Sequence, residues 1–286
     1  MRFLLPLIFS FFISFPVFAE NNTKLYRLDC GSIHVSDLNV FSDRKLYVGQ
    51  DKNLVASCYL IQHGEHILLW DTGIDNRLID KPEGHTHKVF TKKIKQTLEQ
   101  QLAQIDLQLS DITHVAISHA HGDHSENVRL FEHAQLIIQK AEFEALQNHS
   151  ISSQSHLNPE NFKHFLNSDH ANQLQLIDGD TDLFNDGSLQ AIFLPGHTPG
   201  HMALMIDLDN AGKVILSGDQ WHFSENRIHN GVPQFNYDAN VTHKGKQTRL
   251  SSAKLEAVIR QEDALLIIQH EPKHVHRIPV LPGYLD

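Results

Sequence analysis

Hydrophobic and polar residues alternate in short runs along most of the chain, and the first part of the chain holds several runs of strand length. These runs predict strands at Lys24–His34, Ala56–Gln62 and His66–Trp70, the last two joined by a turn. Between residues 92 and 105 the apolar residues recur every three or four positions, which predicts a helix over Lys92–Ile105. The short apolar run Ile112–Ser118 predicts a buried strand that ends at a group of histidines.

Apolar residues at strand-like and helix-like spacings continue to alternate as far as the C-terminus. The pattern predicts further strands at Leu136–Gln139, Leu174–Ile177, Leu189–Leu194, His201–Leu208, Val214–Ser217 and Ala264–Gln269. It predicts further helices at Lys140–Asn148, Pro159–Asn167 and Ser252–Arg260. Strands and helices interleave in both halves, and no linker rich in Pro, Gly or Ser divides them. We therefore expect a layered α/β fold, with residues 20–286 forming a single domain.

Residues 1–19 have the features of a secretory signal peptide. Arg2 supplies a positive charge before an apolar run, and the run ends in a small-x-small cleavage site at Ala19. The alternative is an uncleaved anchor, but the run is slightly short for a membrane span and lacks a stop-transfer cluster. The sequence therefore predicts a periplasmic or secreted protein that begins near Glu20 and has no stable membrane insertion after cleavage.

The overall composition is that of a globular protein, with 41% hydrophobic and 20% charged residues among 286. Lys and Arg number 24 against 34 Asp and Glu, so the formal net charge is −10. A nucleic-acid partner is not expected, since such proteins usually carry a basic face. The 22 histidines indicate either metal chemistry or a histidine-rich surface, and their spacing has to decide between the two.

Two cysteines, Cys30 and Cys58, stand 28 residues apart. In an oxidising compartment they can form one disulfide, which would stabilise the fold by roughly 3–4 kcal/mol in the chain-entropy model. Two separately buried thiols are equally consistent with the sequence, because free cysteine packs as a small hydrophobe.

The segment Ser118–His124 holds four candidate metal ligands within six residues: His119, His121, Asp123 and His124. In an extended chain His119 and His121 point to the same side, and a turn at Gly122 would aim the other two elsewhere. Neutral imidazole and carboxylate suit zinc and similar divalent ions. Three more candidates follow predicted strands: His197, Asp219 and His270. Ligands at the ends of several strands can converge at one edge of a layered domain.

These motifs together resemble the metallo-β-lactamase superfamily. The Trp70–Gly73 segment matches that family's first motif, and the later ligands occur in the family's order. The resemblance covers nearly all of the mature chain. It implies an αββα sandwich with two divalent metal ions, by preference zinc, in a groove at one edge. One ion would be held by His119, His121 and His197, the other by Asp123, His124 and His270, with Asp219 bridging the two. Asp71 would not bind a metal ion itself but would contact the ligands and orient them.

Several flanking stretches are similar to one branch of the superfamily, the quorum-quenching N-acyl homoserine lactonases. These stretches are Tyr26–Gly31, Ser57–Ile61, Ser217–Phe223 and Ile268–Pro272. The similarity implies a hydrolase that opens the lactone ring of a small-molecule substrate by attack of a metal-bridging hydroxide. Asp123 would then pass a proton to the leaving oxygen. His222 occupies the place of a substrate-binding tyrosine in the best-known lactonases, and its N–H can donate the same hydrogen bond.

The remaining residues and alternatives are less specific. His201 and His114 are expected to be structural. Phe223 and Phe235 are expected in the core, with the wall of an acyl-chain pocket as the alternative. His85 and His87 are expected at the surface or at the mouth of the groove. An exported organophosphate or other ester hydrolase would use the same ligands, and a non-catalytic periplasmic zinc-binding protein is an alternative from another class. Lactonases of this type are often homodimers, which is an expectation from the resemblance alone.

Overall fold

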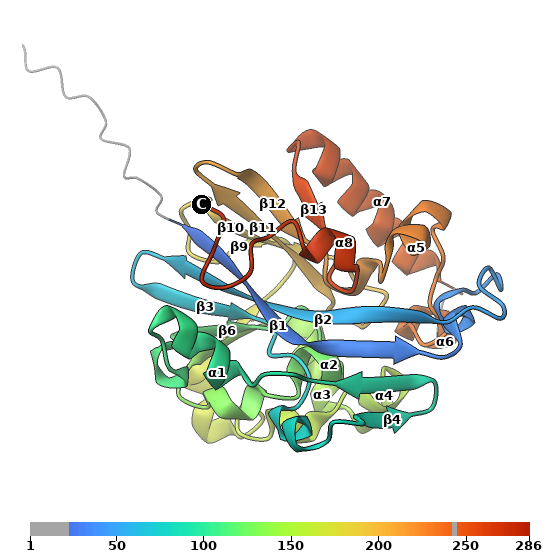
Figure 1. Ribbon diagram of the computed structural model, residues 1–286, viewed down its shortest axis with the longest axis horizontal. Coiled ribbons are helices and arrows are strands. Elements are labelled where there is room, and N and C mark those ends of the chain that lie inside the picture. Colours follow the sequence, from blue (N-terminus) through green and yellow to red (C-terminus); the bar gives the residue numbers. More distant parts are fainter. Residues whose placement is uncertain (1–22, 242–244) are drawn as a thin grey trace, which may run out of the picture.

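Two mixed β-sheets form the centre of the molecule (Figure 1). The computed structural model describes residues 23–241 and 245–286, so the expected signal peptide at 1–19 lies outside the described residues. In order across the sheet, the larger one contains β4 (His85–His87), β5 (Phe90–Lys93), β1 (Lys24–Val35), β2 (Lys52–His63), β3 (His66–Trp70), β6 (His114–Ala116), β7 (Gln135–Gln139) and β8 (Leu174–Ile177). The smaller one contains β13 (Leu265–Ile267), β12 (Gly212–Leu216), β11 (Met202–Leu208), β10 (Leu189–Phe193) and β9 (Thr181–Asp182).

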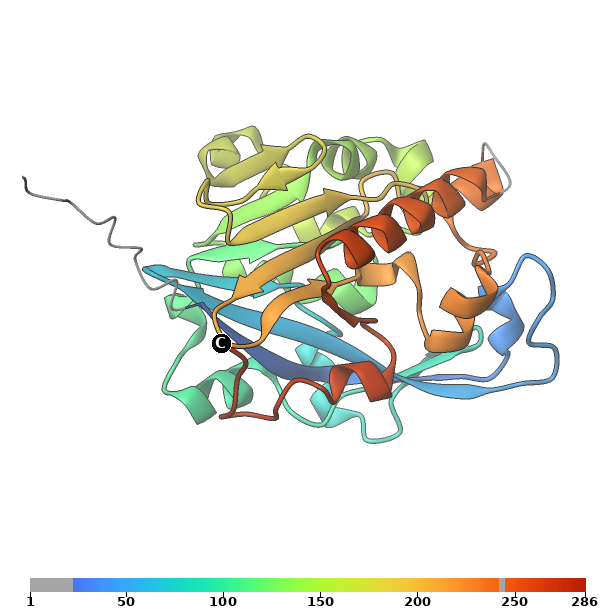
Figure 2. The same ribbon diagram turned by 90° about the horizontal axis from the view of Figure 1, so that it is seen from above.

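Helices cover the outer faces of both sheets. The helices are α1 (Leu98–Leu102), α2 (Gly122–Ser125), α3 (Lys140–Gln147), α4 (His149–Gln154), α5 (Ser224–His229), α6 (Tyr237–Val241), α7 (Lys246–Gln261) and α8 (Pro272–Val275). In Figure 1 helices α1 to α4 lie below the larger sheet, and α7 lies above the smaller one. Figure 2 shows α7 lying across the strands of the smaller sheet. The layers are therefore helix, sheet, sheet, helix, which is the expected αββα sandwich.

Three apolar clusters hold these layers together. Between the sheets, Trp70 of β3 packs in one cluster with Leu204 of β11. Outside the larger sheet, Leu98 of α1 and Phe143 of α3 belong to a second cluster. Outside the smaller sheet, Leu255 of α7 belongs to the third. Burial of these apolar side chains is the main source of stability, at about 25 cal/mol for each Å² removed from water.

The helix expected over Lys92–Ile105 is wrong in its first half. Phe90–Lys93 forms strand β5, which pairs with β1, and the helix proper begins at Leu98. Thr97 caps that helix: its hydroxyl accepts the Gln100 N–H at 3.3 Å, and the Gln100 side chain accepts the Thr97 N–H at 3.0 Å. The helical spacing of apolar residues extends to residues before this cap only by coincidence. Local periodicity does not show that these residues pair with β1, which is distant in the sequence.

Two other helices differ from expectation in extent. The Pro159–Asn167 helix is reduced to a 3₁₀ turn at Pro159–Phe162. The Ser252–Arg260 helix lies inside α7, which begins six residues earlier at Lys246. The sequence pattern did not predict the short elements β4, β9, α4, α5, α6 and α8. Within residues 23–241 and 245–286, no helix combines the length and apolar character needed to cross a membrane.

Cys30 and Cys58 form a disulfide between the neighbouring strands β1 and β2, with Cα atoms 5.7 Å apart. This decides between the two alternatives that the sequence left open. The bond lies against Gly73, where an added Cβ would come within 2.4 Å of Cys30 Cβ. Gly73 also has a φ of +72°, which favours glycine. The disulfide therefore supports the turn that follows β3 and carries Asp71.

Candidate metal centre

All the predicted ligands lie on loops that follow strands. Strand β3 is parallel to β6, and β12 is parallel to β13, so the carboxyl ends within each pair point the same way. The loop after β6 carries His119–His124, and the loop after β10 carries His197. Asp219 lies in the turn after β12, and His270 follows β13. The topology thereby brings residues from both sheets to one edge of the sandwich.

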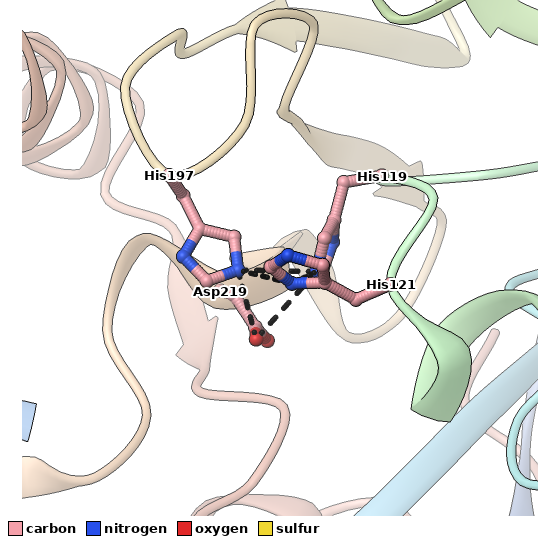
Figure 3. A group of neighbouring side chains, drawn as sticks. All are labelled: His119, His121, His197 and Asp219. Carbon is pink, nitrogen blue, oxygen red and sulfur yellow. Dashed lines mark hydrogen bonds and ion pairs between the residues drawn. The ribbon is translucent and has the colours of Figure 1, made fainter. Parts of the chain in front are cut away.

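The first group consists of His119, His121, His197 and Asp219, whose ligand atoms lie within 4.8 Å of one another. The Nε2 atoms of His119 and His197 are 3.1 Å apart, and each lies 3.0 Å from Nδ1 of His121. Figure 3 shows the three rings turned toward one another, with the Asp219 carboxylate on one side of them. All four residues are buried.

The second group consists of Asp123, His124 and His270, again within 4.8 Å of one another. The Nε2 atoms of the two histidines are 3.3 Å apart, and Asp123 Oδ2 lies 3.6 Å from Nε2 of His270. The short helix α2 supplies the turn at Gly122 that separates Asp123 and His124 from the first group. The structure thus divides the predicted ligands into the two expected sets.

Asp219 faces both groups. Its Oδ2 lies 3.3 Å from Nε2 of His197 in the first group. Its Oδ1 lies 3.0 Å from Nε2 of His270 and 3.2 Å from Nε2 of His124 in the second. One carboxylate therefore presents one oxygen to each set of ligands.

In each histidine, the ring nitrogen that faces away from the centre of its ligand group contacts a hydrogen-bond acceptor. This contact fixes the tautomer of the ring. His121 Nε2–H donates to the Ser155 carbonyl at 2.8 Å, and His270 Nδ1–H donates to the Val55 carbonyl at 2.7 Å. His197 Nδ1–H donates to the Asn236 side-chain oxygen at 2.8 Å. Because these acceptors hold the ring protons outside, the inner nitrogens carry free lone pairs directed at the centre of each group.

The same arrangement applies to the other two rings. His124 Nδ1–H donates to Asp71 Oδ2 at 2.8 Å. The Ser118 hydroxyl donates to the same carboxylate oxygen at 2.8 Å, and its oxygen lies 3.1 Å from Nδ1 of His119. Asp71 also accepts the Ser118 backbone N–H at 2.7 Å and a Gln269 amide N–H at 2.7 Å. Asp71 therefore lies behind the ligands and orients them, as the sequence suggested.

The donor set fits divalent cations. Bare imidazole nitrogens that face one another at 3.0–3.1 Å repel unless a cation lies between them. A tetrahedral ion with metal–nitrogen distances of about 2.0–2.1 Å separates its ligand atoms by about 3.3 Å, close to the spacing seen here. In addition, Asp219 Oδ1 is buried and accepts no hydrogen bond from the described residues. Two divalent ions would satisfy all of these atoms.

The electrostatics of the two groups differ. Burial and the neighbouring imidazoles hold the pKa of His119 and His121 well below its ordinary value. Burial would also lower the pKa of His124, but the carboxylates of Asp219 and Asp71 raise it. Burial would raise the pKa of Asp219, yet the surrounding imidazoles keep it well below its ordinary range. The first group therefore holds the ionised carboxylate of Asp219 beside the neutral rings of His119 and His121, as cation binding requires.

A pocket of about 720 Å³ opens over the two groups, and Asp123, Asp219, His121 and His270 form part of its wall. Much of the remaining wall is apolar: Ile33, Val40, Phe41, Leu54, Val89, Phe90, Leu157 and Phe235. Basic residues also line it: His85, His87, Lys88, Lys92 and His156. Phe235 lines the pocket, which is the alternative that the sequence left open, and it also packs against the core, whereas Phe223 is fully buried as expected.

His222 lies between the metal groups and the apolar wall. Its Nε2 is 3.1 Å from Asp219 Oδ2, and its ring packs against Phe41 with centroids 4.4 Å apart. Its Nδ1 is buried without a hydrogen-bond partner among residues 23–241 and 245–286. Burial lowers the pKa of His222 to about 4, so the ring is neutral near neutral pH. His201 instead accepts the Asp219 backbone N–H at its Nε2, at 2.8 Å, and so supports the turn that carries Asp219.

Several residues that contact the ligands carry no clear signal in the sequence. Lys92 places its ammonium 3.7 Å from Asp123 Oδ1 and 3.4 Å from Glu126 Oε1. Burial opposes the charge on Lys92, but the two carboxylates raise its pKa, and Lys92 in turn lowers the pKa of Asp123. Of the residues missed, only Gln269 had a signal in the sequence, its position directly before His270. Lys92 and Asn236 occupy segments with no recognisable motif.

An αββα sandwich with two adjoining imidazole and carboxylate groups at one edge defines a class of dinuclear metal-dependent hydrolases. Residues 52–270 match the family model described as the metallo-beta-lactamase superfamily. The chain belongs to this superfamily.

Similar proteins fall within one branch of the family. An N-acyl homoserine lactonase of Bacillus sp. is 28% identical over 271 residues, covering 92% of this chain and 98% of that protein. The N-acyl homoserine lactonase AttM of Rhizobium radiobacter is 25% identical over 256 residues, covering 87% and 93%.

Solved structures of such enzymes share the fold. An N-acyl homoserine lactone hydrolase with the product N-hexanoyl-L-homoserine bound at its catalytic metal centre superposes with a TM-score of 0.73 at 22% identity, covering 91% of this chain and 98% of that one. The dizinc quorum-quenching lactonase AidC gives a TM-score of 0.66 at 19% identity, covering 93% and 90%.

Proposed function

We propose that the protein is an N-acyl homoserine lactonase. One observation carries the proposal: Asp219 joins two ligand groups at the floor of a pocket whose wall is largely apolar. This arrangement provides for hydrolysis of a polar ring attached to an apolar tail. The similarity to lactonases along nearly their whole length supports the same substrate class.

Ring opening adds water across the carbonyl carbon–ring oxygen bond, so the carbon gains a hydroxyl and the ring oxygen gains a proton. When bound, two divalent ions would polarise the carbonyl and lower the pKa of water between them. The chain would hold them through the seven ligands described above. His119, His121, His197 and Asp219 would bind one ion, and Asp123, His124, His270 and Asp219 would bind the other. No serine or cysteine nucleophile is required.

We assign two further roles to residues of the pocket floor. His222 is neutral and lines the pocket, with its Nε2 3.1 Å from Asp219 Oδ2. We assign its Nε2–H as the donor to the carbonyl oxygen as negative charge develops there. Asp123 also lines the pocket and passes the proton to the ring oxygen. Because Lys92 lowers the pKa of Asp123, the carboxylate holds this proton only during turnover.

The acyl chain has an apolar surface available beside these groups. Phe41, Phe90 and Phe235 form aromatic contacts with one another, with ring centroids 5.4–6.2 Å apart, and all three line the pocket. We assign this aromatic wall to the acyl tail. Each methylene buried there contributes about 0.8 kcal/mol, so longer chains are expected to bind more tightly until the pocket is filled.

The test compares hydrolysis of N-butanoyl and N-decanoyl homoserine lactone by residues 20–286, followed by proton release. Chelator-treated protein and protein reloaded with zinc run in parallel, with Asp219→Ala as the inactive control. We expect metal-dependent ring opening, with a lower KM for the decanoyl substrate. Absence of turnover by protein that holds two ions would refute the lactone substrate, and organophosphate triesters and thioesters would be the next substrates to try.

We further propose that both ions are zinc and that the protein is exported. Tetrahedral sites rich in imidazole suit zinc, and elemental analysis of the protein purified without added metal tests this. The Cys30–Cys58 disulfide supports export, because such bonds persist in oxidising compartments. N-terminal sequencing of the protein from the cell envelope and the medium should give Glu20 as the first residue.

A further inference from the structure

Glu142 is a fully buried carboxylate that the chemistry above does not use. It lies in the first turn of α3 and is not among the residues that line the pocket. Burial raises its pKa, although two backbone N–H donors act to lower it. An ionisable side chain without solvent is costly unless its oxygens are fully engaged, so its contacts indicate what it does.

The two oxygens of Glu142 contact two different ligand loops. Oε1 accepts the backbone N–H of Ala120 at 2.8 Å, and Oε2 accepts the backbone N–H of Gly200 at 2.7 Å. Ala120 stands between His119 and His121, and Gly200 follows His197 by three residues. One carboxylate therefore ties together the two segments that carry all three imidazoles of the first group.

Close packing at Gly200 supports the same conclusion independently. A Cβ added to Gly200 would lie 2.3 Å from the backbone nitrogen of Glu142 and 2.5 Å from its Cβ. Only glycine lets the loop that carries His197 approach the helix this closely. The loop is thus held against the start of α3 by both shape and hydrogen bonding.

The second group has a different support. Asp71 bonds the ring of His124 and the side chain of Gln269, which precedes His270. The two backbone N–H groups that donate to Glu142 belong to Ala120 and Gly200, in the loops of the first group. Asp71 therefore contacts the second group directly and reaches His119 of the first group only through Ser118, whereas both contacts of Glu142 belong to the first group.

We propose that Glu142 is the positioning residue of the first metal position. Its carboxylate fixes the separation of the His119–His121 segment from the His197 loop, and so the spacing of the three ring nitrogens. Removing it should weaken the ion at the first position and leave the second position, which Asp71 supports, close to its original affinity. The inference rests on the two-ion site of the proposed function but not on the lactone substrate.

The test is metal titration of the Glu142→Gln variant, in competition with a chromophoric chelator, together with absorption spectra of the cobalt-loaded protein. Glutamine keeps the shape of the side chain but offers one acceptor oxygen for the two N–H donors. Glu144→Gln, an exposed position on the same helix, is the matched control. We expect a 10- to 100-fold loss of affinity for one ion only, as is typical for residues behind metal ligands. The cobalt spectrum should then lose the contribution of one site.

Other outcomes are equally informative. Equal weakening of both ions, or unchanged affinity for both, would overturn the assignment. If Glu142→Gln does not fold, Glu142→Asp keeps the charge and is measured instead. Failure of both variants to fold would make Glu142 a folding residue and also overturn the proposal. Wild-type protein that binds fewer than two ions would instead refute the two-ion site itself.

Discussion

The hydrogen bond between Asp71 and His124 allows a sharp test of how the second group is held. Asp71 Oδ2 accepts from the Ser118 hydroxyl, from His124 Nδ1 and from the Gln269 amide, all within 2.7–2.8 Å. In an Asp71→Asn variant, the amide has one acceptor oxygen for the four donors around it, and with its NH2 group in the place of Oδ2 it would face three of them. His124 would then have to accept at Nδ1 and carry its proton on Nε2, which is the nitrogen directed at Asp219 and His270.

The magnitude follows from the type of bond that is lost. A buried hydrogen bond to a charged group contributes about 1.5–3 kcal/mol. At about 1.4 kcal/mol for each factor of ten, this corresponds to a loss of roughly 10- to 100-fold in affinity for the second ion. The backbone should not add to the effect: Asp71 has a φ of +59°, and asparagine tolerates this left-handed conformation as well as aspartate does.

The assay is metal content by elemental analysis after dialysis against a graded series of chelator concentrations. Asp180→Asn, at an exposed position, serves as the matched control for an Asp to Asn change. We expect Asp71→Asn to lose one ion at a chelator concentration at which the control retains both. If the variant kept two ions with unchanged affinity, the tautomer argument would be refuted.

Three further predictions address the pocket floor, the disulfide and the surface. His222→Phe should keep both ions and lower kcat/KM roughly 10- to 100-fold, and an unchanged kcat/KM in a lactone assay would show that the ring only fills space. Replacing Cys30 and Cys58 by serine should reduce the free energy of unfolding by about 3–4 kcal/mol, measured by urea denaturation, because the bond closes a loop of 28 residues. Burial would raise the pKa of Asp186, but hydrogen bonds from Ser188 and His63 lower it to about 2, so its contribution to stability is present above about pH 4 and declines as pH falls toward 2. The difference in urea midpoint between wild type and Asp186→Asn should therefore shrink from pH 6 to pH 3, and it should stay small because the side chain is half exposed.

The ligand set could be predicted because the ligands stand close together in the sequence or directly after predicted strands. His119, His121, Asp123 and His124 lie within six residues, and the remaining ligands directly follow apolar runs that form strands. Strand ends are fixed by topology, so ligands placed there meet at one edge of the sandwich. The layered fold could likewise be predicted, because helical and strand patterns alternate along the chain.

The supporting contacts could not be predicted, because they depend on long-range geometry. The acceptors for His121 and His270 are the main-chain carbonyls of Ser155 and Val55, which any residue type supplies. Glu142 looked like an ordinary polar position in a short helix, although it is fully buried. Sequence spacing likewise left the state of the cysteines open, since it does not show that Cys30 and Cys58 lie on paired strands.

The hairpin of β4 and β5 shapes the pocket wall but supplies none of the metal ligands. It contributes His85, His87, Lys88, Val89, Phe90 and Lys92 to the pocket wall, while the seven metal ligands all come from other loops. It also lies at the edge of the larger sheet, where strands are joined on one side only. Insertions, deletions or exchanges in this hairpin that keep Lys92 beside Asp123 can therefore reshape the cavity while the seven metal ligands stay in place. Natural divergence and directed evolution toward new acyl tails should concentrate their changes here.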